Sequence, residues 1–415
     1  MRFAGRGELE GGRAAAVQRS APRLYVLDGL RILAALMVVM FHYVSLRGGW
    51  GQDTSDIFPE LKPLAQYGWL GVEVFFLISG FVICMSTWGR SLGDFVMSRV
   101  SRVYPAYWVA IGLTTLIVSL WPQVRQVHSY DDVLTNLTML QTGFGVWDVD
   151  GVYWTLFVEL KFYVLFAIVV ATGVTYRKCV LFCALWTVVA MTSTQVDSKL
   201  LTMWAMPLYA PYFVAGIAFY LMYRYRPTAL LWGIAGLSLL LAQHHLTKRV
   251  ADNSTHDIAV WPARLIVLAA FVIMALIALG ACNRIQWRWL STAGALTYPL
   301  YLIHQYIGMT IIYALREKLP PYVLVAGLIV AMMGAAWLLH RLVERPMGSW
   351  LRKIMRSSMD EVRRHSPAGK ATDAGRVADK VIPAPDAAPA VTPQRLRAYG
   401  PAEPDRVGAG RPDGT

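Results

Sequence analysis

Charged residues are scarce in this chain, and their scarcity excludes most soluble folds. Only 16% of the 415 residues are Asp, Glu, Lys or Arg, whereas soluble domains carry about a quarter. Hydrophobic residues make up 56%, and the mean hydropathy is +0.43. Apolar runs of the ~20 residues that cross a bilayer as a helix recur from Leu24 almost to Leu342. The sequence therefore predicts an all-α integral membrane protein that contacts the lipid bilayer along most of its length.

Cysteine is also scarce, and its spacing excludes the common metal sites. The four cysteines lie in or at the ends of apolar segments, without CxxC or Cys/His zinc spacing. We therefore expect no metal, and nothing indicates a tightly bound cofactor. The net charge of +13 sits at the termini and in short loops rather than in a patch interleaved with aromatic residues, so nucleic acid is not an expected partner.

About ten transmembrane helices can be drawn, and the basic residues orient them. Lys and Arg concentrate before the first span and in alternate loops, which places those loops and both termini in the cytoplasm. Aspartates gather in opposite loops such as 47–66 and 122–150, which should face outward. The predicted spans are 24–46, 67–88, 103–121, 152–172, 179–194, 204–222, 228–246, 258–281, 290–313 and 321–343.

Three regions follow from this pattern. Residues 1–23 form a basic cytoplasmic segment, which is not a signal peptide because the next apolar run holds Asp28 and Arg31 and no cleavage site. Residues 24–346 form the transmembrane domain. Residues 347–415 are basic and then rich in Pro and Ala, so we expect a disordered cytoplasmic tail.

Titratable residues inside membrane spans are costly and therefore candidates for function. Eleven residues separate Arg31 from His42, which places them on one helix face roughly 16 Å apart along the axis. An anionic head held near the cytoplasm, with a reactive end reaching outward to a basic His42, would suit this geometry. The alternative is that Arg31 snorkels to the interface and His42 bonds a neighbouring helix.

Three further titratable residues are expected at the depth of His42. Glu73, Glu159 and His304 all fall in the outer halves of their spans. A carboxylate beside His42 would fix its tautomer and raise its basicity, as general-base catalysis on a hydroxyl requires. A proton-coupled transporter would use the same groups as a proton relay, whereas a purely structural scaffold or sensor has no use for them.

Two arginines precede the third span at helical spacing. Arg99 and Arg102 present an i, i+3 fork that suits phosphate. Simple anchoring at the cytoplasmic interface is the alternative. Ser79 lacks the strand-turn-helix setting of a nucleophile elbow, so we expect it to serve helix packing.

Six segments of the chain carry a family resemblance. They are LDGLRILAALMVVMFHY (27–43), GVEVFFLISGF (71–81), RVSRVYPAYW (99–108), WTLFVELKFY (154–163), GALTYPLYLIH (294–304) and ERP (344–346). With these segments in the same order, the chain resembles the bacterial acyltransferase-3 family of integral membrane O-acyltransferases from Leu27 to about Pro346. The family usually has Asp in place of Glu73 and Ser in place of Thr155, and both changes keep a polar group.

The resemblance implies an acyltransferase of the bacterial inner membrane that uses acyl-coenzyme A, typically acetyl-coenzyme A. It implies that His42 is essential and that Arg31, Arg99, Arg102 and Glu159 belong to the functional site. Family members acylate hydroxyls of cell-surface or exported polysaccharides and glycolipids, and also of macrolide antibiotics, so both acceptor classes stay open.

The residues and the resemblance combine into one mechanistic hypothesis. Arg31, Arg99 and Arg102 would hold the phosphates of coenzyme A. His42, oriented by Glu159 or Glu73, would deprotonate the acceptor hydroxyl or carry the acyl group itself. His304 and Tyr301 would line the acceptor side. The acyl chain length and the oligomeric state are left open by the sequence.

Overall fold

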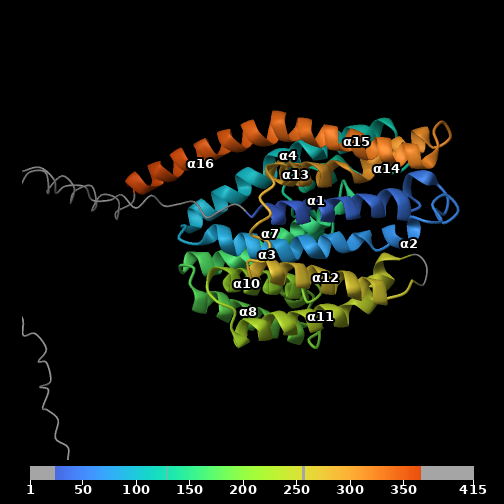
Figure 1. Ribbon diagram of the computed structural model, residues 1–415. Coiled ribbons are helices and arrows are strands. Elements are labelled where there is room, and N and C mark those ends of the chain that lie inside the picture. The colour runs from blue at the N-terminus through green and yellow to red at the C-terminus, as the bar shows by residue number, and fades with distance from the viewer. Residues whose placement is uncertain (1–23, 128, 255–257, 366–415) are drawn as a thin grey trace, which may run out of the picture. The chain divides into compact units, whose positions relative to one another are not determined.

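A computed structural model describes residues 24–127, 129–254 and 258–365, and these residues form helices and loops without a strand (Figure 1). The chain divides into a large unit, 1–359, and a short C-terminal unit, 360–415, of which only the end of one helix is described. The helices are α1 Tyr25–Met40, α2 Lys62–Ala65, α3 Gly71–Thr87, α4 Leu92–Leu120, α5 Tyr130–Asn136, α6 Gln141–Phe144, α7 Trp154–Ala171, α8 Tyr176–Ser193, α9 Lys199–Ala205, α10 Ala210–Arg224, α11 Ala229–Asn253, α12 Trp261–Ala278, α13 Arg288–Ile303, α14 Gln305–Leu315, α15 Pro321–Leu339 and α16 Arg345–His365.

Five short helical turns of the 3₁₀ or π type lie between the described α-helices. Three 3₁₀ turns, η2 Gly48–Trp50, η3 Gly68–Leu70 and η4 Gly151–Tyr153, precede or follow longer helices. Two π-helical turns, η1 Phe41–Ser45 and η5 His340–Glu344, extend α1 and α15. Turns of the π type are rare and often occur at functional sites.

The prediction of an all-helical membrane protein is confirmed. Among the described residues, eight helical stretches are long and apolar enough to cross a membrane. The two other predicted spans correspond to α8, which carries Arg177, Lys178 and several hydroxyl residues, and to α13 and α14, which meet at His304 and are each too short to span alone. The positions of both termini, predicted to be cytoplasmic, lie outside the described residues.

Helices α3 and α10 cross at the centre of the protein. Helix α10 is buried from Ala210 to Met222. A Cβ atom on Gly80 would collide with the backbone oxygen of Phe213, and one on Gly216 would collide with that of Leu77. Glycines at the crossing therefore let the two backbones touch, which is how membrane helices commonly associate.

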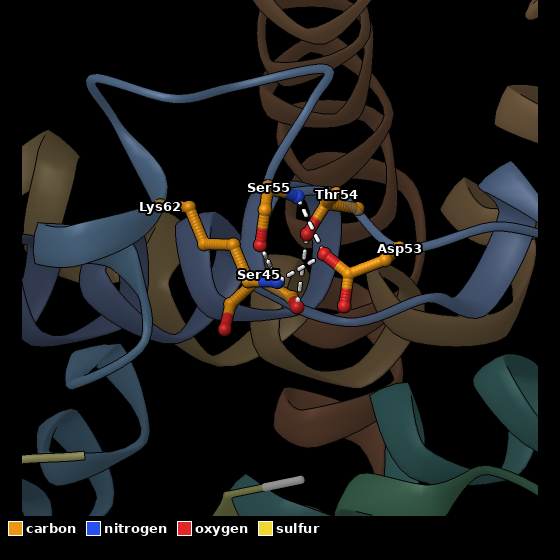
Figure 2. Close-up of polar contacts among 5 residues, drawn as sticks. All are labelled: Ser45, Asp53, Thr54, Ser55 and Lys62. Atoms are coloured by element: carbon orange, nitrogen blue, oxygen red, sulfur yellow. Dashed lines mark hydrogen bonds and ion pairs between the residues drawn. The ribbon is translucent and has the colours of Figure 1, made fainter. Parts of the chain in front are cut away.

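The loop after η1 folds back over the end of that turn. Figure 2 shows Lys62 Nζ donating to Asp53 Oδ1 at 2.6 Å and to Ser55 Oγ at 2.7 Å. The Thr54 hydroxyl, which is buried, donates to the Ser45 backbone oxygen at 3.2 Å. The loop thereby satisfies a carbonyl at the open end of η1.

The C-terminal part of the described chain differs from the sequence-based prediction. Residues 347–365 were expected in a disordered tail, but they are helical in α16. The helix continues directly from α15 and η5, and Gly348 lies against the backbone of Ser101 while Met359 lies against Gly93. Packing on α4 thus gives this segment a partner that its polar composition did not reveal. The rest of the predicted tail, 366–415, lies outside the described residues.

Candidate active site

His42 lies in the π-helical turn at the end of α1. The residue is 9% exposed, and Nδ1 lies 2.8 Å from the backbone oxygen of Val38. The same Nδ1 lies 3.1 Å from Nε2 of His304, and the two ring centroids are 5.0 Å apart. The structure therefore brings together two histidines that are 262 residues apart in the sequence.

His304 is fully buried where α13 gives way to α14. Its Nδ1 lies 2.8 Å from the Tyr301 backbone oxygen, which can only accept, so Nδ1 carries the proton. In the neutral ring Nε2 is then an acceptor. His42 Nδ1–H is consequently shared between Val38 O and His304 Nε2, and His42 Nε2 keeps a lone pair. This tautomer is the one that a general base requires.

Three arginines line one cavity near the other end of α1. Arg31, Arg99 and Arg102 border a space of about 440 Å³ together with Glu159 and Tyr163. The Nε atoms of Arg31 and Arg99 are buried and have no hydrogen-bond partner among the described residues. The predicted cluster of arginines is therefore assembled, with donors left over for an anion.

A second cavity adjoins the arginine cavity. Its volume is about 510 Å³, and it shares Arg31 and Glu159 with the first cavity. Tyr301 also lines this cavity, and its ring centroid lies 5.6 Å from that of His304. The Tyr301 hydroxyl lies 2.9 Å from Thr155 Oγ1. Tyr301 therefore connects the two parts of the site, because it lines this cavity and its ring lies beside that of His304.

Glu159 lies at the arginine cavity, which differs from the predicted depth. Its carboxylate accepts from the Ser79 hydroxyl at 2.7 Å and from the Tyr163 hydroxyl at 2.6 Å. Among the described residues, no hydrogen bond or ion pair joins it to His42. The prediction that Glu159 orients His42 is not met, because α7 places this carboxylate level with Arg31 rather than with His42.

Glu73 is held by a residue that the sequence analysis did not single out. Arg249 donates to Glu73 Oε1 from Nη2 at 2.7 Å and from Nε at 3.2 Å. Arg249 also lies over the rings of Trp69, at 5.1 Å, and Tyr209, at 5.2 Å. Glu73, the other residue predicted to orient His42, instead forms a buried ion pair with Arg249 between α3 and α11. The predicted span 228–246 ended before Arg249 and left it in a loop, whereas α11 continues to Asn253 and includes it.

Metal ligation finds no support in the described residues. No group of three or more His, Cys, Asp or Glu side chains there could hold a metal ion. Cys84 and Cys179 lie 3.8 Å apart between Sγ atoms, but they are buried in helix packing between α3 and α8.

The fold and this site define a polytopic helical membrane protein with an arginine-lined cavity and a separate buried histidine pair. The family model described as "Acyltransferase domain", of the acyltransferase-3 type, matches residues 24–341. The chain therefore belongs to the acyltransferase-3 family, as the resemblance had indicated.

Two relatives show where the chain is similar to named proteins. It is 33% identical to "Exopolysaccharide production protein ExoZ" of Rhizobium meliloti (strain 1021) over 108 residues, which cover 24% of this chain and 33% of that protein. It is 23% identical to "Putative peptidoglycan O-acetyltransferase YrhL" of Bacillus subtilis (strain 168) over 171 residues, which cover 37% of this chain and 24% of that protein. The matches thus span a third or less of either relative. No solved structure matches the chain significantly.

Proposed function

We propose that this chain is an O-acyltransferase of the bacterial inner membrane that moves an acyl group, acetyl in the simplest case, from acyl-coenzyme A to a hydroxyl of a cell-surface or exported polysaccharide or glycolipid. The observation that supports it most is the arrangement of groups about α1: a cavity lined by three arginines lies near Arg31, and a histidine pair lies at the other end of the helix, at His42. The relatives named for exopolysaccharide production and peptidoglycan acetylation favour a polysaccharide acceptor over a macrolide.

The arginine cavity suits the phosphates of the donor. Guanidinium groups bind phosphate through charge-assisted, often bidentate hydrogen bonds. Arg31 and Arg99 have buried N–H groups that lack partners, so donor binding would satisfy donors that are otherwise costly to bury. Glu159 in the same cavity offsets part of the positive charge while the donor is away. The distance of roughly 16 Å from Arg31 to His42 suits the extended arm between the phosphates and the thioester.

Acyl transfer would then occur at His42. Nε2 of His42 takes the proton of the acceptor hydroxyl as its oxygen attacks the thioester carbonyl, and the tetrahedral adduct expels the thiolate. The imidazolium returns the proton to sulfur, so the products are the ester and free coenzyme A. While His42 is charged, its Nδ1–H donates to neutral His304 Nε2, which stabilises the imidazolium and holds the ring in place. Tyr301 lines the cavity next to this pair.

The decisive assay measures thioester consumption by the full chain in nanodiscs. Acetyl-coenzyme A is the donor, and cell-envelope glycans and then macrolides are the acceptors. Wild type should release coenzyme A and form an acetylated glycan, and His42→Gln should lose at least ~100-fold in kcat, because general-base catalysis contributes about that much. His244→Gln, an exposed histidine of α11, is the matched control.

Three outcomes would count against the proposal. Undiminished transfer by His42→Gln would remove His42 from the mechanism. If only macrolides were acetylated, the acceptor would be a macrolide rather than a polysaccharide or glycolipid. Absence of thioester consumption, together with proton-driven uptake of a solute into vesicles, would replace the enzyme by the transporter that the sequence left as a rival.

A further inference from the structure

The backbone around His304 is held by side chains from other parts of the chain. In a continuous helix the Leu302 oxygen would accept from the Tyr306 N–H. Here the Leu302 oxygen accepts from the Tyr153 hydroxyl at 3.2 Å, and the Tyr306 N–H donates to Asp150 Oδ2 at 3.2 Å. Asp150 immediately precedes η4, and Tyr153 ends η4 just before α7. One short segment therefore supplies the partners of both groups at the junction of α13 and α14.

A third bond ties His304 to the turn that carries His42. The Tyr43 hydroxyl donates to the His304 backbone oxygen at 2.7 Å, so neighbouring residues of η1 contact the ring and the backbone of one histidine. Gly308 makes room for it, because a Cβ there would collide with the Tyr43 hydroxyl. Tyr43 is in turn held by Trp50, whose Nε1 donates to the Tyr43 backbone oxygen at 2.8 Å.

These partners are buried completely. Tyr43, Tyr153 and Asp150 each have 0% exposure. Burial raises the pKa of the Asp150 carboxyl to about 7, so its charged form is costly to keep there. A continuous helix through His304 would need none of these buried polar groups. Keeping the interruption therefore costs the free energy of burying them.

We propose that Tyr43, Tyr153 and Asp150 are positioning residues that hold the His304 ring against His42. The proposal rests on the proposed function, in which His42 is the base. None of the three lines the cavity that we assign to the substrates. Their removal should therefore lower kcat, because the base loses its orientation, while the KM for the donor stays unchanged.

Tyr43→Phe and Tyr153→Phe test the proposal, with Tyr67→Phe as the matched control. The Tyr67 hydroxyl also donates to a backbone oxygen, that of Ala259 at 2.7 Å, but away from the histidines. Transfer by the full chain in nanodiscs should fall about 10-fold or more in kcat for Tyr43→Phe and less for Tyr153→Phe, with the donor KM within about 2-fold. The control should keep the wild-type kcat.

A second measurement keeps the proposal testable even without a substrate. Imidazole ¹⁵N spectra of the histidine-labelled protein, with signals assigned through His42→Gln and His304→Gln, report which nitrogen carries the proton. We expect the Nδ1–H form for both rings in wild type and in Tyr67→Phe, and a mixture of tautomers in Tyr43→Phe. Unchanged tautomers in both Phe variants, or a fall in kcat equal to that of Tyr67→Phe, would overturn the positioning role. A wild type without the Nδ1–H pair would instead count against the proposed base.

Discussion

Neutralising Arg31 separates donor binding from chemistry. Arg31→Gln removes a guanidinium whose Nε has no partner among the described residues and which borders both cavities. A hydrogen bond from a charged group to phosphate contributes about 1.5–3 kcal/mol. Since 1.36 kcal/mol is a factor of ten, the KM for acetyl-coenzyme A should rise about 10- to 100-fold. The kcat should change little, because the same contact exists in the ground state and the transition state.

The protein itself should tolerate the change. Glu159 keeps its hydrogen bonds from Ser79 and Tyr163 when Arg31 is neutral, so this carboxylate retains its donors. The thermal midpoint in detergent should therefore stay close to that of wild type. Arg284→Gln, which alters an exposed arginine in a loop, is the matched control and should leave KM unchanged.

The assay compares two donors that carry the same thioester. Acetyl-coenzyme A has the phosphates, and S-acetylpantetheine lacks them. The effect of Arg31→Gln should be large for the first and absent for the second, so that the ratio isolates the contact between arginine and phosphate. An equal rise in KM for both thioesters would refute the reasoning, because Arg31 would then act on the arm, the acyl group or the fold.

Three other substitutions test separate parts of the site. Glu73→Gln leaves Arg249 buried without its anion, which should cost about 3–5 kcal/mol of stability and lower the thermal midpoint; combining it with Arg249→Met should restore much of the loss. Asp150→Asn should make the free energy of unfolding less sensitive to pH. The wild-type carboxyl, with its pKa raised to about 7, is neutral at pH 5.5 in the folded protein but ionised in the unfolded chain. The free energy of unfolding of wild type should therefore fall by about 2 kcal/mol between pH 5.5 and 8, and that of the variant should not. His304→Gln should lower kcat at least ~100-fold with unchanged donor KM, and an equal loss in KM would place His304 in substrate binding instead.

The sequence predicted best what a single helix determines. Arg31 and His42 lie on one continuous helical stretch, so their separation followed from the rise per residue alone. The apolar runs predicted the membrane fold for the same reason, since each helix must satisfy its own backbone in lipid.

The orienting partner of His42 could not be predicted because it depends on where different helices begin. The positions of Glu73, Glu159 and His304 within their predicted spans placed all three side chains at the same depth in the membrane. In the structure Glu73 lies in the first turn of α3 and reaches Arg249, whereas Glu159 lies level with Arg31. Of these three residues only His304 contacts His42, and Pro299 and the surrounding apolar residues do not indicate that α13 ends beside it.

A neutral partner for the base has a physical rationale that a carboxylate lacks. An ionised carboxylate buried at membrane depth needs a cation or several donors, as Glu73 has with Arg249 and Glu159 has with Ser79 and Tyr163. A second imidazole orients His42 through one hydrogen bond and carries no charge between turnovers. A thioester is already an activated acyl donor, so for the proposed transfer the surrounding residues must above all supply the placement of the imidazole.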